Sequence, residues 1–484
     1  MATAQQPTPP PPGRAEFVKA ISRLDATALV VGSMIGSGIF IVSAEILREV
    51  HAPGLLLVVW ALSGIVTLMG ALSYGELAAM FPNAGGQYVY LREGISPLFG
   101  YLYGWTLFVV IQTGTIAAVA VAFARFTSVL VPALSPDLWP GLGTLVTLPQ
   151  PIGPIQVGFS PQRLFAILSI VVLTWINVRG VRTAAIIQTS LTAIKTAALA
   201  GLIVLGISIG RNAAAVATNF GPGFWPVGGV TLALLPVIGA ATVGSLFSMD
   251  AWNNVGFAGS ELKNPQRDLP FAMAAGVLTV TALYLLANVS YLSVLPADAI
   301  AHAPQDRVGT AALQAIFGNA GLDIMAVAIM ISTFGCNNGL ILSGARVYYA
   351  MARDNLFFKT AGILHPRYKT PSVALVVQAA WTCALCLSGT YSQLLNFVIF
   401  AALLFYLLTA LGLFALRVRR PTAERLVKSV GYPWVPGLYV AATGLIAIDL
   451  LVNHVTRTYS VLGLVLVLLG VPVYFFWRRV VAPT

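Results

Sequence analysis

Apolar residues occur along this chain in long stretches, separated by short segments that carry most of its prolines and charges. The stretches are roughly 18–27 residues long, as a membrane-crossing helix requires, whereas a barrel strand needs only about ten. Inside hydrocarbon every backbone amide and carbonyl must be paired within the protein, and a helix achieves this by itself. The pattern predicts twelve membrane-spanning helices, at residues 24–47, 53–80, 97–131, 162–178, 183–209, 231–259, 271–295, 311–351, 371–388, 391–416, 435–455 and 459–478.

Composition agrees with this pattern. Of the 484 residues, 58% are hydrophobic and 9% are charged, which is too little charge to cover a soluble protein of this length. We therefore expect an all-α polytopic membrane protein without a soluble domain of useful size. A pump driven by its own nucleotide hydrolysis is excluded on the same ground, and the sequence has no G-x-x-x-x-G-K-[ST] phosphate-binding loop.

The two ends of the predicted spans differ in charge. Of the 27 lysines and arginines, twenty fall on the side that includes the N-terminus, five on the opposite side and two within spans. The positive-inside rule then places both termini in the cytoplasm and predicts a multi-pass protein of the plasma (inner) membrane. The basic residues are scattered among short loops, so the net charge of +11 does not indicate nucleic-acid binding. Residues 1–22 are expected to form a disordered cytoplasmic tail without a secretory signal.

Two of the predicted helices are interrupted at mid-membrane depth. In the first, the sequence Ile-Gly-Ser-Gly at 35–38 is poor helix material. The backbone either unwinds there to bind a solute or presents small residues for helix packing. In the sixth, Asp250, Trp252 and Asn253 interrupt an apolar stretch, and a charge at that depth costs at least about 2.5–3.5 kcal/mol unless it faces the protein interior or water. The two interruptions occupy matching positions in successive five-helix blocks, which favours a transport site.

With the two blocks and the segments around them, the chain is predicted to have six parts. They are the tail at 1–22, a first block at 23–209, an extracytoplasmic connection at 210–230, a second block at 231–416, a cytoplasmic loop at 417–434, and two further helices with the cytoplasmic C-terminus at 435–484.

Further motifs make the chain similar to a known family. They are GSGIF at 36–40, WN at 252–253, ELKNP at 261–265 with LP at 269–270, STFG at 332–335 and SGAR at 343–346. Together they resemble the amino acid–polyamine–organocation (APC) superfamily and, within it, the L-type amino acid transporters and their bacterial relatives. The resemblance implies a five-plus-five inverted repeat of the LeuT type, with broken first and sixth helices and two peripheral helices.

The resemblance also implies which residues form the site. The substrate-binding set is Met34, Ile35, Gly36, Ser37, Gly38, Phe247, Ser248, Asp250, Trp252 and Asn253, and the coupling set is Lys195, Ser33, Ser332 and Thr333. The amides of Ser37 and Gly38 would bind a carboxylate at a helix N-terminus. Carbonyls near Met34, Ile35 and Phe247 would accept from the α-ammonium. Phe247 and Trp252 would form a lid and a wall, and Asn253 would cross-link the unwound region.

Three polar residues keep more than one interpretation. Asp250 stands where L-type carriers usually have glycine; it pairs with the substrate ammonium, recognises a cationic side chain or polyamine, or accepts amides of the unwound segment. The resemblance implies that Lys195 bridges the first and eighth helices, in contact with backbone near Ser33 and the side chain of Ser332 or Thr333. It would act either as a proton carrier or as a permanent positive charge that replaces sodium. Glu76 forms a gate ion pair or lies at a solvated helix end.

The expected function is therefore a secondary carrier of α-amino acids that works by alternating access, through proton symport or amino acid exchange, without sodium. Two alternatives stay open: a polyamine or cationic amino acid carrier or antiporter that uses Asp250, and a sensor without net transport. An enzyme is excluded, because Asp250 and Lys195 alone do not form a catalytic set, and no cofactor or metal is expected. The loop at 132–161 lacks the cysteine that joins animal L-type carriers to a heavy chain, so no disulfide-linked subunit is expected. The expected partners are the substrate, the lipid bilayer and protons.

Overall fold

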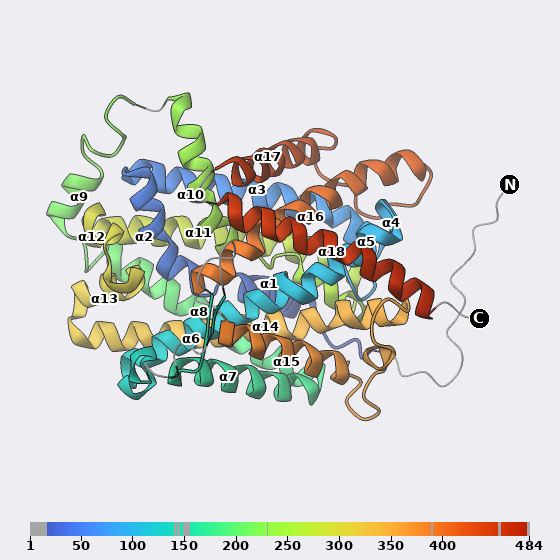
Figure 1. Cartoon of the computed structure of the whole chain (residues 1–484). Coiled ribbons are helices and arrows are strands. Elements are labelled where there is room, and N and C mark those ends of the chain that lie inside the picture. Colours follow the sequence, from blue (N-terminus) through green and yellow to red (C-terminus); the bar gives the residue numbers. More distant parts are fainter. Residues whose placement is uncertain are drawn as a thin grey trace.

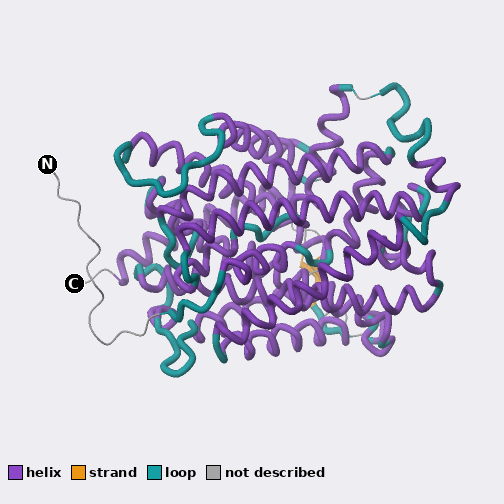
Figure 2. The backbone as a smooth tube through the Cα atoms, turned by 180° about the vertical axis from the view of Figure 1, so that it is seen from behind, coloured by secondary structure: helices purple, strands orange, loops and turns teal. Residues whose placement is uncertain are grey.

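The structure is a computed structural model that describes residues 17–139, 142, 146–148, 155–229, 231–388, 391–453 and 456–481. Its helices run side by side as one bundle whose connections gather at two ends (Figure 1). Figure 2 shows the same arrangement from behind, with loops at both ends and helix between them. The helices at the expected spans are α1 (Arg23–Met34) with α2 (Gly38–Val50), α3 (Pro53–Met80), α5 (Pro97–Thr106) with α6 (Gln112–Leu130), α7 (Pro161–Val178), α8 (Val181–Ile207), α10 (Leu235–Ser248), α11 (Pro265–Val294), α14 (Asn319–Arg353), α15 (Ser372–Ser388), α16 (Tyr391–Arg419), α17 (Trp434–Val452) and α18 (Arg457–Val481).

Membrane-length helices dominate the part of the chain that the structure describes. Nine of its helices are long and apolar enough to cross a bilayer, and the bent pair α1–α2 adds a tenth. The shorter apolar helices α10 and α15 lie at the sixth and ninth predicted spans. The prediction of an all-helical, multi-span membrane protein is confirmed, apart from a two-stranded hairpin of β1 (Val146–Leu148) and β2 (Ile155–Val157).

The structure differs from the predicted spans in several places. The eighth span, predicted as one helix, is divided at Gly318, whose φ of 63° ends α13 (Val308–Phe317) before α14 begins. The third span, in contrast, is continuous as predicted, and a π-helical turn, η1 (Leu107–Ile111), lies within it. Short helices that are not long enough to span also occupy predicted loops; they are α4 (Gln87–Gly94), α9 (Ala213–Asn219) and α12 (Ala297–Ala301).

Residues 17–22 belong to the folded protein, although they were expected in the disordered tail. Ile21 is buried, and its backbone pairs with Glu261 and Lys263 across N···O distances of 2.9 and 3.0 Å. Ser22 caps α1, since its hydroxyl accepts from the amide of Asp25. The rest of the expected tail, residues 1–16, lies outside the described residues.

Helix α1 begins and α18 ends at the same end of the bundle, which we call the terminal end. Phe17 packs edge-on against Tyr349 near the end of α14, and Phe358 packs edge-on against Trp477 near the end of α18. In the interior, α1 lies against α8, α11 and α14, while α10 lies against α2, α3, α16 and α17. The two interrupted helices are therefore enclosed by other helices, with α11 in contact with both α1 and α2.

Candidate functional site

The first helix is broken where the glycine-rich sequence predicts. α1 stops at Met34, α2 starts at Gly38, and the two axes differ by 42°. Ile35 leaves the helix with extended backbone angles, and Ser37 stands at the N-cap of α2. Both residues are buried, so the backbone polar groups at this break face protein.

The sixth helix is broken as well. α10 ends at Ser248, and a turn at 249–253 leads into a 3-10 helix, η5 (Asn254–Glu261). Within the turn, Ala251 has a φ of 69°. A residue with a Cβ pays steric strain in this left-handed region, so the surrounding structure must hold the turn in place.

The two breaks touch each other. A Cβ atom on Gly38 would lie 2.1 Å from Ser248 Oγ and 2.7 Å from Ser248 Cβ, so only glycine allows this approach. The hydroxyl of Tyr284, on α11, lies 2.9 Å from the carbonyl oxygen of Met34 and 3.2 Å from that of Ser248. One buried side chain thus bridges the two breaks.

Lys195 holds the first break from α8. Its buried ammonium donates to the carbonyl oxygens of Gly32, Ile35 and Ser332, the last two at 2.8 and 3.3 Å. Sequence reasoning expected side-chain contacts with Ser332 or Thr333. The Ser332 contact is instead with its carbonyl, and the hydroxyl of Thr333 donates within its own helix to Ile329 at 2.8 Å.

Helix α14 completes the enclosure of this break. The hydroxyl of Ser332 donates to the carbonyls of Ile35 and Gly36 at 3.1 and 3.2 Å, and the thiol of Cys336 donates to that of Ser33 at 2.9 Å. A carbonyl oxygen has two lone pairs. That of Ile35 already accepts from both Lys195 and Ser332 in this conformation.

Most of the predicted residues of the second break are buried but reach different neighbours. Trp252 packs against Tyr74 and Tyr406, with ring centroids 4.8 and 5.7 Å away. The amide of Asn253 donates to the Gln87 side chain of α4 at 2.6 Å, so Asn253 cross-links the turn to α4 rather than to the first break. Phe247 and Ser248 are also buried.

Asp250 makes its side-chain hydrogen bond to α16 and not to the first break. Its carboxylate accepts from the hydroxyl of Tyr406, on α16, and lines a small cavity of about 20 Å³. The walls of that cavity come from α3, α10, α16, α17 and the turn after α10, without a residue of α1 or α2.

Sequence reasoning missed the polar face of α11. Tyr284, Asn288 and Tyr291 are buried at helical spacing along it. Asn288 accepts from the hydroxyl of Ser43 at 2.6 Å, and Tyr291 donates to the carbonyl of Ile39 at 3.3 Å. The spacing i, i+4, i+7 indicates one helix face and could have been recognised in the sequence. The hydrogen bonds of Asn288 and Tyr291 hold α2 against the bundle.

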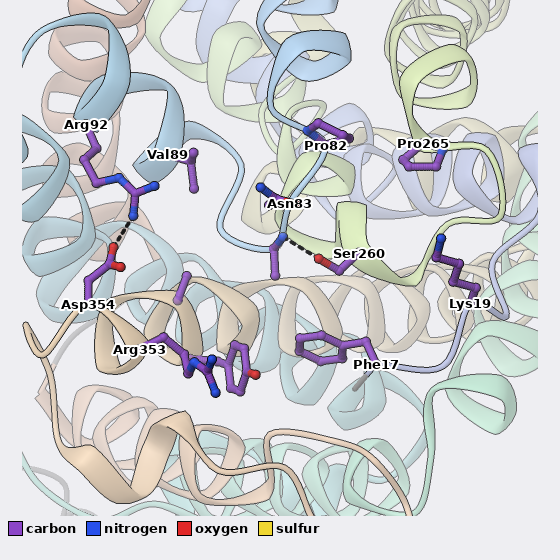
Figure 3. Close-up of a pocket in the computed structure, with 13 residues that line it drawn as sticks. Phe17, Lys19, Pro82, Asn83, Val89, Arg92, Ser260, Pro265, Arg353 and Asp354 are labelled. Carbon is purple, nitrogen blue, oxygen red and sulfur yellow. Dashed lines mark hydrogen bonds and ion pairs between the residues drawn. The ribbon is translucent and has the colours of Figure 1, made fainter. Parts of the chain in front are cut away.

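A second group of polar contacts lies at the terminal end. There a pocket opens between the residues before α1, the loop after α3, α4 and the end of α14 (Figure 3). Arg92 forms an ion pair with Asp354, which also accepts from the hydroxyl of Tyr88 at 2.6 Å. Burial and the neighbouring carboxylate raise the pKa of Tyr88, so this phenol stays a hydrogen-bond donor. These contacts join α4 to the end of α14.

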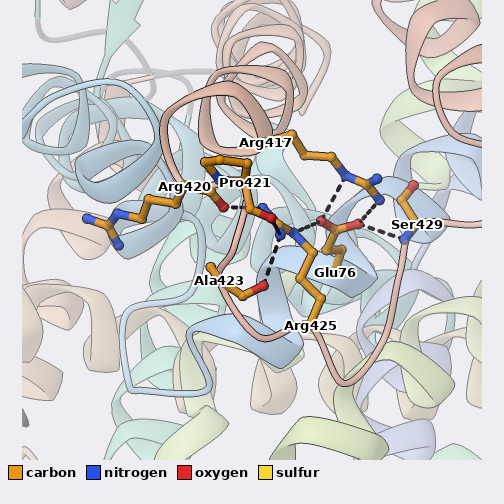
Figure 4. Close-up of polar contacts among 7 residues, drawn as sticks. All are labelled: Glu76, Arg417, Arg420, Pro421, Ala423, Arg425 and Ser429. Carbon is orange, nitrogen blue, oxygen red and sulfur yellow. Dashed lines mark hydrogen bonds and ion pairs between the residues drawn. The ribbon is translucent and has the colours of Figure 1, made fainter. Parts of the chain in front are cut away.

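Glu76 is a buried ion-pair partner, which settles its two interpretations against the solvated helix end. Its carboxylate accepts from Arg417 at 2.5 and 3.1 Å, from Arg425 at 2.9 Å, and from the amide of Ser429 at 2.8 Å (Figure 4). The end of α3 is thereby tied to the loop between α16 and α17. Glu261 and Arg346, from two of the sequence motifs, form another ion pair at 2.9 Å in which both side chains are 1% exposed.

Comparison of the chain with known proteins identifies its family. A family model for amino acid permeases matches residues 21–477. The chain is 31% identical over 464 residues to the serine/threonine exchanger SteT of Bacillus subtilis, covering 95% of this chain and 97% of that protein. It is also 31% identical to two mouse (Mus musculus) proteins, the large neutral amino acids transporter small subunit 2 over 480 residues and the Asc-type amino acid transporter 1 over 478 residues, each covering 96% of this chain and 83% of the relative. The chain therefore belongs to the amino acid permease family of the APC superfamily, whose members are transporters and not enzymes.

Proposed function

We propose that this protein is a secondary active carrier that moves α-amino acids across the plasma (inner) membrane by alternating access, without sodium. The observation that carries the proposal is the contact between the two helix breaks, bridged by Tyr284 and enclosed by α8, α11 and α14. Broken helices that meet inside a bundle are how transporters of this architecture expose backbone groups to a solute.

The proposed membrane arrangement has twelve spans and cytoplasmic termini. The nine long helices and the bent pair account for ten of these spans. We assign the other two to α10 with η5 and to α15, which are shorter but occupy predicted spans. The first block at 23–209 and the second at 231–416 then form the two inverted repeats, and 435–484 the peripheral pair. The excess of basic residues on the side of the N-terminus supports a cytoplasmic terminal end.

The substrate binds at both breaks in this proposal. Its carboxylate lies at the N-terminus of α2, where the amides near Ser37 and Gly38 and the helix dipole favour an anion. Its ammonium lies between the carbonyl of Met34 and the carbonyls at the end of α10. Met34 has a lone pair left beside the Tyr284 bond, whereas Ile35 must first release Lys195 or Ser332.

Lys195 supports sodium independence. Its ammonium already occupies a position between the carbonyls of α1 and α14, and a second cation there would be repelled. The same position makes movement of α1 depend on Lys195, because the break cannot move away from α8 without losing these bonds.

Neutral or zwitterionic amino acids fit the observations better than polyamines. The carboxylate of Asp250 is bound to Tyr406 and lines a cavity without a residue of the first break. It therefore does not belong to the group of carbonyls that we propose binds the substrate ammonium. A cationic substrate would need Asp250 to leave Tyr406 and turn toward α2.

Uptake into proteoliposomes tests the function. The purified full chain should take up a labelled neutral amino acid when unlabelled amino acid is inside or when a proton gradient is imposed, and replacing sodium with choline should leave the rate unchanged. Unlabelled lysine and spermidine, added as competitors, should inhibit weakly. The proposal fails if no amino acid is taken up under either driving condition, and binding without uptake would indicate a sensor.

A further inference from the structure

Asp250 is half-buried, and unlike the fully buried carboxylates among the described residues it forms no ion pair. Glu76 is paired with Arg417 and Arg425, Glu261 with Arg346, and Asp268 with Arg23, as the ion pairs among the described residues show. None of those pairs includes Asp250, whose carboxylate accepts from two neutral donors, the hydroxyl of Tyr406 and the backbone amide of Ala251. A carboxylate at membrane depth that lacks a counter-charge is expensive unless it binds a cation or a proton.

The groups around Asp250 make it the one acid of its cavity. The titratable side chains near it are Tyr406 of α16 and Tyr439 of α17, which line the cavity, and Tyr103 of α5 and Cys336 of α14, which interact with Asp250 electrostatically. Phenols and thiols are neutral in their protonated forms, so none of them neutralises a carboxylate. No lysine, arginine or histidine lines the cavity.

The cavity beside Asp250 has the size of one water molecule. Its volume is about 20 Å³, and roughly 10–15 Å³ suffices for a water with two to four polar neighbours. Thr67 and Thr443 also line it, and their hydroxyls donate to helix carbonyls at 2.8 and 2.7 Å. Their oxygens keep lone pairs for a water. A carboxylate, a phenol and a water position are the elements of a proton-binding site.

We propose that Asp250 and Tyr406 form a proton-binding site, on the side of α10 that faces α16 and α17, through which transport is coupled to a proton gradient. The proposal rests on the proposed carrier function and assigns its coupling ion. In the ionised state, Tyr406 donates to the carboxylate. A proton from the outer solution adds to a carboxylate oxygen, the resulting carboxyl O–H donates to Tyr406 Oη or to the water, and the proton leaves on the cytoplasmic side after the conformational change.

Proton binding would also loosen the second break. Hydrogen bonds to an ionised group are about twice as strong as neutral ones, so the ionised Asp250 holds the turn at Ala251 firmly against α16. Ala251 has a left-handed φ of 69° that needs such support. Neutralising Asp250 weakens the support and lets the turn change while substrate is bound.

Two transport measurements on the full chain in proteoliposomes test the proposal. The first is exchange of amino acid at equal pH on both sides; the second is uptake into empty vesicles that are one pH unit more alkaline inside, with proton entry followed by an internal pH dye. One proton per substrate supports about tenfold accumulation for that gradient. The wild type should show both activities. Asp250→Asn should lose gradient-driven accumulation and proton entry, and the exchange that it supports should no longer depend on pH.

Two further variants keep the test decisive if Asp250→Asn fails to fold. Tyr406→Phe should keep gradient-driven uptake but move its pH midpoint upward, because the ionised form loses a hydrogen bond. Asp449→Asn, which changes another carboxylate, on α17 and outside this cavity, should change neither activity. A Tyr406→Phe profile identical to that of the wild type would count against the site.

The remaining outcomes separate the two proposals. If the wild type exchanges amino acid but does not respond to the gradient, the proton site is refuted and the carrier function stands. If the wild type shows neither exchange nor gradient-driven uptake, both proposals are refuted. If Asp250→Asn keeps gradient-driven accumulation, or if Asp449→Asn abolishes it, the assignment to Asp250 is wrong. A sodium-driven uptake that depends on Asp250, or loss of lysine and spermidine uptake alone, would show that this carboxylate binds a different cation.

Discussion

Tyr284→Phe removes one oxygen atom from the point where the two helix breaks meet. The ring of Tyr284 is fully buried and packs edge-on against Trp60, with centroids 5.2 Å apart, and phenylalanine keeps that packing. The hydroxyl bridges the carbonyls of Met34 and Ser248. Both carbonyls stand at the ends of interrupted helices, where no backbone amide replaces the lost donor.

The expected cost follows from those two carbonyls. A buried acceptor that loses its donor costs about 1–3 kcal/mol, and the bond to Met34, at 2.9 Å, is the better of the two. We expect a lower melting temperature in detergent. We also expect KM for amino acid exchange to rise about fivefold or more, since 1 kcal/mol corresponds to about that factor. Misplaced carbonyls would bind the ammonium less well.

Tyr291→Phe is the matched control. Tyr291 lies on the same helix and is equally buried, and its hydroxyl donates at 3.3 Å to the carbonyl of Ile39. That carbonyl is inside α2 and also accepts a helical hydrogen bond, so the expected cost is at most about 1 kcal/mol, with KM unchanged. If the two variants lose equal stability and bind substrate equally well, Tyr284 is an ordinary packing residue and the bridge has no role in binding.

Three further changes test other contacts. Gly38→Ala should abolish exchange, because the added Cβ would lie 2.1 Å from Ser248 Oγ at the end of α10. Gly201→Ala, on α8 with nothing within 4 Å of the added Cβ, should leave exchange intact. Normal exchange in Gly38→Ala would refute the close approach. Glu76→Gln should destabilise the protein in a thermal melt by about 3 kcal/mol, because two guanidinium groups lose a buried partner. Glu93→Gln, whose carboxylate is partly exposed and pairs with Arg92 and Arg420, should cost about 0–1 kcal/mol, and equal shifts would contradict the first estimate. Lys195→Met should reduce exchange at least about tenfold, equivalent to 1.4 kcal/mol, and near-normal exchange would show that the break is held without it.

Hydrophobic pattern predicted the fold well where membrane length was the deciding property. The second predicted span and α3 share the bounds 53 and 80, because a proline begins the helix and Phe81-Pro82 follows its end. Gly318 was missed because the polar residues around it, such as Asn319, are too few to interrupt the apolar stretch, and its positive φ separates α13 from α14. Helices α4 and α9 were missed because neither is long enough to span.

The candidate site was predictable in part for a similar reason. Glycines and serines at 35–38 and polar residues at 250–253 indicate where helices break, and both breaks occur there. Which way a side chain points after a break is a different matter, because helical periodicity ends with the helix. The turn at Ala251 directs Asp250 toward Tyr406, and no spacing in the sequence indicates that direction.

Two charged residues, Lys195 and Asp250, link the two breaks to different helices. Lys195 binds carbonyls of the first break from α8, and Tyr406 binds Asp250 of the second from α16. Tyr284 contacts both breaks, so Lys195→Met and Tyr284→Phe act on neighbouring carbonyls of one segment. Double-mutant cycles on melting free energy should then give a coupling of about 0.5–3 kcal/mol for that pair, and agreement with additivity within about 0.5 kcal/mol for Lys195→Met with Tyr406→Phe. Strong coupling in the second pair would mean that the breaks respond as one rigid unit, and alternating access would then have to arise elsewhere in the bundle.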